Sequence, residues 1–217
     1  ETGTVTDIDG NVYKTVKIGQ QWWMAENLKG KHYRNGDPIP NGTGSLSNRT
    51  SGAFCYPGND ENNISEYGLL YNWYAVNDIN NVSPENWRIP TDVDWKKLEM
   101  YLGISQSELN QENYRGTKEG GYLKETGFEH WNSPNVGATN ESNFFALPAG
   151  GNGDDFFSGL NENTAFWTST ENSTGRAWVR VLHTDEAGIT RASFEKDNCY
   201  SIRCIRDTQL PIQYSLT

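Results

Sequence analysis

Basic residues, cysteines and long apolar runs are all scarce in this sequence of 217 residues, and each scarcity excludes a class of protein. The 18 lysines and arginines are outnumbered by 28 aspartates and glutamates, so the formal net charge is −10. An acidic surface repels phosphate backbones and anionic lipids, so we expect no nucleic-acid partner. No run approaches the roughly 20 apolar residues that span a bilayer, so we also expect no membrane insertion.

Cysteine occurs only at Cys55, Cys199 and Cys204, which excludes a miniature scaffold held together by several disulfides. At most one internal disulfide can form, and one thiol is then left over. The chain starts at Glu1 with no basic and apolar leader, so we interpret it as part of a longer precursor for which secretion is permitted.

Aromatic residues are abundant, with 8 Trp, 11 Tyr and 8 Phe, and there are 22 glycines. Disordered chains are poor in aromatic residues, so this composition predicts a folded domain with many loops. No internal repeat or linker divides the chain. We therefore predict one domain over residues 4–207, followed by a tail or linker at 208–217.

The local patterns predict strands at both ends of the domain and helices between them. Short apolar stretches separated by turns at Asp9-Gly10-Asn11 and at Gly19 predict an opening β-meander. Four stretches spaced 8 to 12 residues apart predict an antiparallel sheet near the C-terminus: 165–169, 177–182, 189–194 and 200–205.

Two main helices and one shorter helix are predicted. Apolar residues at 69, 70, 73 and 76 have helical spacing, which predicts a helix over 67–76. Thr91 and Asp94 form a capping-box pattern ahead of a Trp95 stripe that ends at Gly103, which predicts a second helix. A similar cap at Ser105 predicts a shorter polar helix that ends near residue 114.

Several long motifs resemble the Fibrobacter succinogenes major paralogous domain family. They include TDIDGNVYKTVKIGQQWWMAENLK at 6–29, WRIPTDVDWKKLEMYLG at 87–103, HWNSPNVGATNESNFFALPAG at 130–150 and SIRCIRD at 201–207. Members of this family are surface and secreted proteins of bacteria of the Fibrobacter and Bacteroides type. The resemblance therefore implies a location outside the cell or on its outer surface.

The motif order is also similar to the C-type lectin-like fold, especially the branch that includes formylglycine-generating enzymes. The resemblance implies an α+β domain with two main helices packed on twisted antiparallel sheets and with long irregular loops. Those enzymes use a pair of thiols five residues apart, as are Cys199 and Cys204. Against an oxidase of this kind, an offset of five places two side chains on opposite faces of a strand. We instead interpret Cys204 as a core residue and Cys55 and Cys199 as the candidates for a bridge; the sequence does not decide which two cysteines pair.

Two oxygen-rich loops could hold a hard cation. Asp60 and Glu61 lie in one of them, and Asp154 and Asp155 lie in the other. Calcium prefers six to eight oxygen ligands in flexible geometry, so structural calcium is the candidate cofactor, although such loops are more often plain solvated turns. The sugar-binding calcium motifs of true C-type lectins are missing, since the nearest string, Ser133-Pro134-Asn135, lacks the carboxylate.

A candidate recognition surface lies on the C-terminal strands and loops. Tryptophan, phenylalanine and arginine anchor interfaces or stack on sugar rings. The candidates are Trp167, Trp178, Arg180, His183, Arg191 and Phe194. Trp178 and Arg180 fit the core as well as the surface. The other tryptophans at 22, 73, 87 and 95 are interpreted as core residues.

We favour a non-catalytic adhesion module that recognises a glycan or a cell-surface protein, because no catalytic motif is present. A formylglycine-generating-type oxidase and a structural spacer of a surface fibre are the two alternatives. A fold alone does not identify a function, so the similarity to those enzymes is weak support for catalysis.

Overall fold

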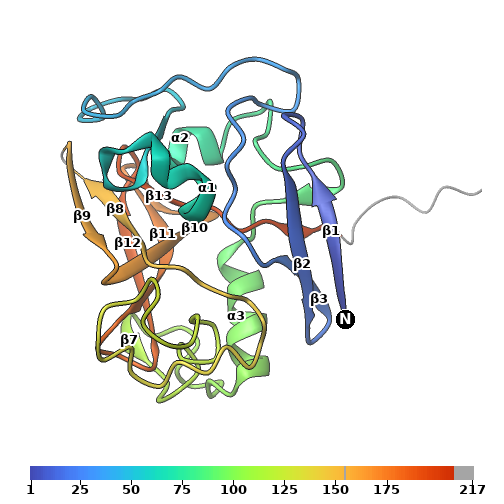
Figure 1. Cartoon of the computed structure of the whole chain (residues 1–217), viewed down its shortest axis with the longest axis vertical. Helices are drawn as coiled ribbons and strands as arrows, with labels where there is room; N and C mark the ends of the chain where they lie inside the picture. Colours follow the sequence, from blue (N-terminus) through green and yellow to red (C-terminus); the bar gives the residue numbers. More distant parts are fainter. Residues whose placement is uncertain (154, 208–217) are drawn as a thin grey trace, which may run out of the picture.

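Two β-sheets with one long helix between them form the protein in the computed structural model (Figure 1), which describes residues 1–153 and 155–207. Asp154 and the predicted tail at 208–217 lie outside the described residues. Sheet and loop predominate and the helices are few and short, so the fold is β-rich. None of the helices in the described part of the chain is long and apolar enough to cross a membrane.

The smaller sheet contains the predicted β-meander. Its strands, in spatial order, are β1 (Thr2–Thr6), β2 (Val12–Ile18), β3 (Gln21–Met24), β14 (Ile205–Arg206) and β6 (Trp87–Arg88). Both predicted turns contain a glycine with positive φ, 81° at Gly10 and 60° at Gly19. Because the left-handed region suits glycine, the sequence signal and the observed turns agree.

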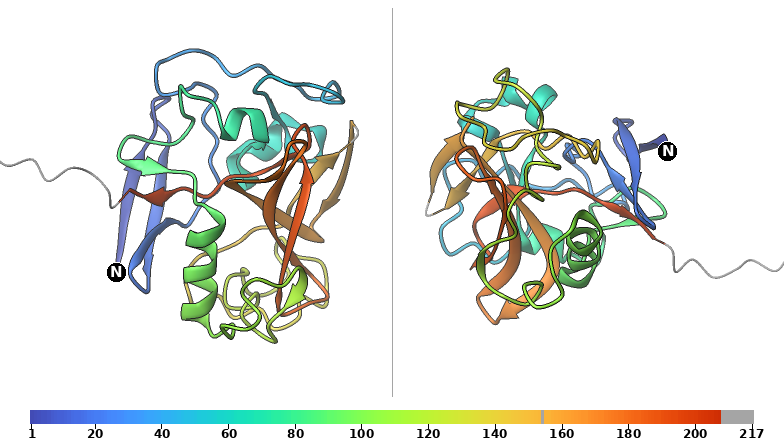
Figure 2. Two further views of the ribbon diagram at one scale, coloured as in Figure 1. Left: turned by 180° about the vertical axis from the view of Figure 1, so that it is seen from behind. Right: turned by 90° about the horizontal axis from the view of Figure 1, so that it is seen from below.

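The larger sheet contains the predicted C-terminal strands. Its main path is β4 (Phe54–Cys55), β5 (Leu70–Asn72), β13 (Cys199–Ser201), β8 (Ala149–Gly153), β10 (Asn163–Ser173), β11 (Arg176–His183), β12 (Ile189–Glu195) and β7 (Asn113–Arg115), and β9 (Phe156–Leu160) pairs with β8. The predicted single strand at 200–205 is divided between the sheets, because β13 joins the larger one and β14 the smaller one. The connecting segment crosses between them (Figure 2).

Helix α3 (Asp92–Leu102) confirms the second predicted helix together with its caps. The Thr91 side chain accepts from Asp94 N, Asp94 accepts from Thr91 N, and Gly103 ends the helix with a φ of 125°. Trp95 and Leu98 are buried in a cluster that also holds residues of both sheets. The helix therefore fills the space between the sheets (Figure 1).

An aromatic cluster joins α3 to both sheets. Trp95 lies 5.0 Å from Trp23 of the smaller sheet and 5.7 Å from Phe166 of the larger one, measured between ring centroids. The core predictions are confirmed for Trp73, Trp87 and Trp95, whereas Trp22 is half-buried.

The helix predicted over 67–76 is wrong as one element. Helix α1 (Ile64–Tyr67) stops at Gly68, residues 70–72 form β5, and α2 (Trp73–Val76) then adds one turn capped by the Asn72 side chain. Gly68 has a φ of 73° and a ψ of −158°, a conformation that breaks the helix and is almost restricted to glycine. The apolar positions are therefore buried as strand and helix pieces, and the described residues contain one main helix, not the two predicted.

The short helix predicted from Ser105 to residue 114 is also wrong. Ser105 Oγ donates to the Glu108 carboxylate and does not accept from a backbone N–H as a cap would; turns follow, and Asn113 has a φ of 66°. Residues 113–115 pair with β12 as strand β7. The pairing places the Arg115 side chain in the core, which helical continuation would prevent.

Substitution of Gly68 by alanine should destabilise the protein severely. The new Cβ would lie 2.8 Å from Leu28 O, in a backbone conformation that alanine rarely adopts. We expect a loss of about 3 kcal/mol or more in the free energy of unfolding, measured by urea denaturation. Gly10→Ala is the matched control, since Gly10 also has positive φ but has open space around it, and should cost about 1 kcal/mol.

Candidate functional site

Two carboxylates on one face of α3 bind three arginines of the larger sheet. Asp92 and Glu99 are seven residues apart, so they lie along one stripe of the helix. The arginines come one from each of three neighbouring strands, β11, β12 and β7: Arg180, Arg191 and Arg115. All five residues are buried.

Arg180 bridges the two carboxylates. Its Nη1 lies 2.9 Å from Asp92 Oδ1, and its Nε donates to Glu99 Oε1. Arg115 donates to both oxygens of Glu99 at 2.7 and 3.1 Å, and Arg191 donates to both oxygens of Asp92 at 2.9 and 3.0 Å. Arg180 and Arg191 face each other directly on adjacent strands, so their like charges need Asp92 between them.

This ion network occupies three of the predicted ligand-binding residues. Arg180 and Arg191 have carboxylate partners inside the protein, and the Arg191 guanidinium stacks on Trp178 with Cζ 3.4 Å from the ring centroid. Arg180 is fully buried, and Trp178 is 9 % exposed. Buried side chains do not form a recognition surface. Of the two interpretations of Trp178 and Arg180, core and surface, the structure therefore agrees with the core.

Two of the remaining predicted residues, His183 and Phe194, line a groove on the opposite face of the same strands. This sheet groove has a volume of about 340 Å³ and is lined by Gly151, Gly153, Phe156, Ser158, Asn163, Ala165, Val181, His183, Thr190, Phe194 and Tyr200. His183 and Phe194 are thus among its walls. The register brings the lining together, because Asn163 pairs with His183 and Ala165 with Val181, which in turn pairs with Thr190.

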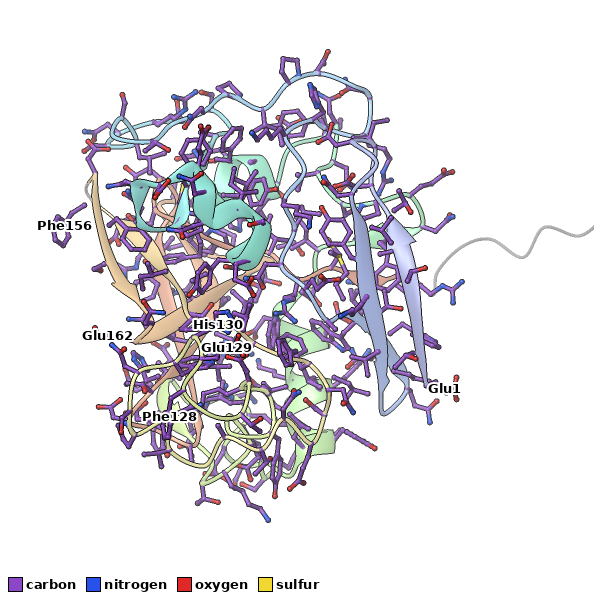
Figure 3. The ribbon with its side chains drawn as sticks, in the orientation of Figure 1. Glu1, Phe128, Glu129, His130, Phe156 and Glu162 are labelled. Carbon is purple, nitrogen blue, oxygen red and sulfur yellow. The ribbon has the colours of Figure 1, made fainter. Side chains whose placement is uncertain are left out.

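Aromatic side chains extend from the core into the sheet groove. Trp167 is fully buried, and its ring centroid lies 5.0 Å from that of Tyr200, which lies 5.4 Å from Phe194. Trp167 therefore supports the floor from below and does not face a ligand. Phe156, at the tip of the β8–β9 hairpin, is 72 % exposed and points away from the ribbon (Figure 3).

Four polar side chains of the sheet groove have no hydrogen-bond partner among the described residues. Ser158, Asn163, His183 and Thr190 make no side-chain hydrogen bond within residues 1–153 and 155–207. The ordered end of β11 is held from behind by Lys124, whose Nζ donates to the carbonyl of His183 at 2.8 Å. Burial lowers the pKa of Lys124 to about 8. The lining thus offers unpaired hydroxyl, amide and imidazole groups on a fixed framework.

A larger cleft of about 580 Å³ separates the smaller sheet from the loop at 140–147. Arg203 lies at its base, where its guanidinium donates to Asn27 Oδ1 at 2.6 Å and to Phe145 O at 2.8 Å, and also to Phe144 O. Burial lowers the pKa of Arg203. Because these donors are bound to groups of the protein, Arg203 acts as a clamp between the loop and β3.

The acidic loops predicted to hold calcium have internal roles. The Asp60 carboxylate accepts from Asn62 N at 3.0 Å and caps a short turn, while Asp155 accepts from the backbone of Leu46 and Ser47. Glu61 is exposed at the start of the same turn, and Asp154 lies outside the described residues. A calcium ion at these loops stays a prediction.

All three cysteines are buried free thiols. Cys199 hydrogen-bonds to Cys55 in a cluster beside β5, whereas Cys204 belongs to a different cluster, as expected of a core residue. Burial raises the pKa of both Cys199 and Cys204 well above the usual range. Cys199 and Cys204 therefore lie in different clusters, and Cys55 and Cys199 are hydrogen-bonded free thiols in the structure, not the predicted disulfide.

Sequence reasoning missed several residues of the sheet groove, notably Phe156, Ser158, Asn163 and Tyr200. The available signal was the pair of phenylalanines after a glycine-rich turn. Only the strand pairing shows that Phe156 lies opposite Gly153 and that Asn163 lies opposite His183.

These features define a β-rich domain with an open, aromatic groove on its larger sheet. A family model described as the Fibrobacter succinogenes major domain matches residues 16–206. The chain therefore belongs to that family, which confirms the resemblance seen in its motifs. No curated protein and no solved structure matches it.

Replacing Asp92 by asparagine should destabilise the protein and flatten its response to acid. Burial raises the pKa of Asp92, but the Arg191 hydrogen bond and the Arg180 charge outweigh it and hold the pKa below the usual range. The stabilisation is therefore present above the unfolded-state pKa of about 4 and is lost as the pH falls through the lower native value. We expect the free energy of unfolding of Asp92→Asn to be about 3 kcal/mol lower than that of the parent at pH 7. Between pH 5 and pH 2, the free energy of unfolding of the variant should fall less than that of the parent.

Urea unfolding at each pH measures this difference. Asp37→Asn is the control, because Asp37 is exposed and has no ion pair within the described residues. An identical acid response of Asp92→Asn and the parent would contradict the assignment.

Thiol titration should distinguish the states of the cysteines. Because all three thiols are buried and the pKa values of Cys199 and Cys204 are raised, we expect no reaction with an aromatic disulfide reagent under native conditions. Denaturation should release three reactive thiols. Release of one thiol would instead demonstrate the bridge between Cys55 and Cys199.

Proposed function

We propose that this chain is a non-catalytic binding module of a bacterial surface or secreted protein, and that a neutral glycan binds in the sheet groove. The observation that carries the proposal is the set of four polar side chains without internal partners, Ser158, Asn163, His183 and Thr190. Polar groups left unpaired on a fixed sheet are available to the hydroxyl groups of a ligand.

The chemistry of the lining favours a sugar over a charged ligand. Sugar rings have apolar faces that stack on aromatic side chains, and Phe156, Phe194 and Tyr200 supply such surfaces. No lysine, arginine or carboxylate is among the described residues that line the groove. A phosphate or a strongly charged peptide would find no counter-charge there.

Glycan recognition through this groove would not need calcium. A calcium-bridged sugar requires carboxylate ligands beside the binding surface, and the described lining has none. We therefore expect aromatic stacking and direct hydrogen bonds to provide the affinity. A glycan array probed with the purified domain, once with calcium and once with chelator, tests this; hits in both conditions are the expected result.

An array with no hits in either condition would contradict the glycan proposal. Concentration-dependent self-association without a ligand would then favour the structural spacer, and binding to a purified cell-surface protein would favour an adhesion module with a protein partner. Hits abolished by the chelator would support a lectin, but one that binds its glycan through a cation and not through the sheet groove.

Removal of the Phe156 ring should weaken glycan binding without affecting the fold. The ring is 72 % exposed at the edge of the groove, so Phe156→Ala removes a stacking surface and little core packing. We expect affinity for a glycan found on the array to fall about five- to tenfold, measured by calorimetry. Phe128→Ala is the matched control, because Phe128 is 65 % exposed and does not line the groove. Equal affinity of both variants would place the site elsewhere.

A further inference from the structure

A second cluster of polar side chains lies in the loop after Lys124, away from the sheet groove. One ring nitrogen of His130 and one carboxylate oxygen each of Glu125 and Glu129 lie within 4.8 Å of one another. Figure 3 shows Glu129 and His130 next to each other, below α1. We propose that these three residues bind a divalent transition-metal ion, and that Glu66 orients the histidine from its other side.

The ring of His130 is held between two carboxylates. Its Nδ1 lies 2.9 and 3.0 Å from the two oxygens of Glu125, and its Nε2 lies 3.1 Å from Glu66 Oε1. Histidines that bind metals with one ring nitrogen commonly donate the other N–H to a carboxylate, which fixes the orientation of the ring. Glu66 occupies that second position, and Nδ1 faces the carboxylate of Glu125.

The charges of the cluster call for a cation. Three carboxylates, those of Glu66, Glu125 and Glu129, surround one imidazole, and no lysine or arginine in the described part of the chain forms an ion pair with them. Glu125 is 4 % exposed, and His130 is the one partner of its carboxylate among the described residues. A buried carboxylate is costly without a compensating positive charge, and a divalent ion supplies it.

The surrounding structure holds the ligands in place and leaves one acceptor unused. Asn161 Nδ2 donates to His130 O, and the Tyr67 ring meets the His130 ring edge-on at 5.7 Å. Asn135 Nδ2 donates to Glu125 O at 2.9 Å, whereas its Oδ1 is buried and has no partner. Asn135 Nδ2 also donates to Gly127 O at 2.8 Å, so this side chain fixes the backbone around the first ligand.

The ligand set selects the class of metal. Imidazole and carboxylate together suit Zn²⁺ and its first-row neighbours, whereas Ca²⁺ and Mg²⁺ prefer oxygen ligands alone. Three protein ligands are the number found in zinc sites with an open coordination position, and Glu129 is exposed, so solvent can reach the ion. This site is separate from the acidic loops predicted to hold calcium.

Zinc titration of the tag-free, chelator-stripped domain tests the proposal. Isothermal calorimetry should show one Zn²⁺ per chain, and the same titration with Ca²⁺ should show none at this site. His130→Gln and Glu125→Gln should each weaken Zn²⁺ binding by more than about tenfold, and Glu66→Gln by about tenfold, because Glu66 only orients the ring.

His32→Gln is the matched control. His32 Nδ1 also contacts a carboxylate, that of Asp9 at 2.5 Å, but it is not part of the cluster. Its variant should bind Zn²⁺ as the parent does. Absence of saturable binding at one ion per chain, or equal binding by His130→Gln and the parent, would overturn the proposal.

A spectroscopic measurement on the unaltered chain avoids dependence on the folding of variants. Cu²⁺ bound at one equivalent should show hyperfine coupling to imidazole nitrogen in pulsed electron paramagnetic resonance, and the coupling should persist in His32→Gln. Copper bound without nitrogen coupling would also overturn the proposal. Because Phe156→Ala leaves these ligands unchanged, its Zn²⁺ affinity should equal that of the parent, so this outcome is independent of glycan binding.

Discussion

The pairing of two buried carboxylates with three buried arginines is the constraint on which the larger sheet depends. Asp92 and Glu99 are a fixed distance apart on α3, so they determine where β11, β12 and β7 lie against the helix. Removing one charge would leave others buried without a partner, which costs far more than a surface ion pair contributes. The same strands present the sheet groove on their other face. The ion network on the buried face thus holds the strands that form the floor of the groove in register.

Local signals predicted the parts of the fold that local chemistry determines. The capping box at Thr91 and Asp94, the turn at Gly10 and the C-terminal stretches at 165–169, 177–182 and 189–194 all have short-range causes, and the structure contains each of them. Periodicity at 67–76 misled because it cannot detect the backbone angles of Gly68, which break the pattern into three short elements. The cap at Ser105 misled because long-range pairing of β7 with β12 overrode it.

The candidate site was harder to predict because residue type does not reveal which face of a strand a side chain occupies. Arg180 and Val181 are neighbours in sequence, yet one lies in the ion network and the other lines the sheet groove. Arginine and tryptophan are common in recognition surfaces, which made them candidates for the site. In the structure, the arginines bind the buried carboxylates of α3 and stabilise the fold instead. His183 and Phe194 lie on the open face, which only the register of β10, β11 and β12 establishes.

The segment from Cys199 to Arg206 enters both sheets at internal positions. Strand β13 lies between β5 and β8, and β14 lies between β3 and β6 (Figure 2). During synthesis, neither sheet can therefore form its internal strand pairs until these residues have been made. The two sheets and the helix between them should therefore complete their structure together, as one cooperative unit, once residue 206 has left the ribosome.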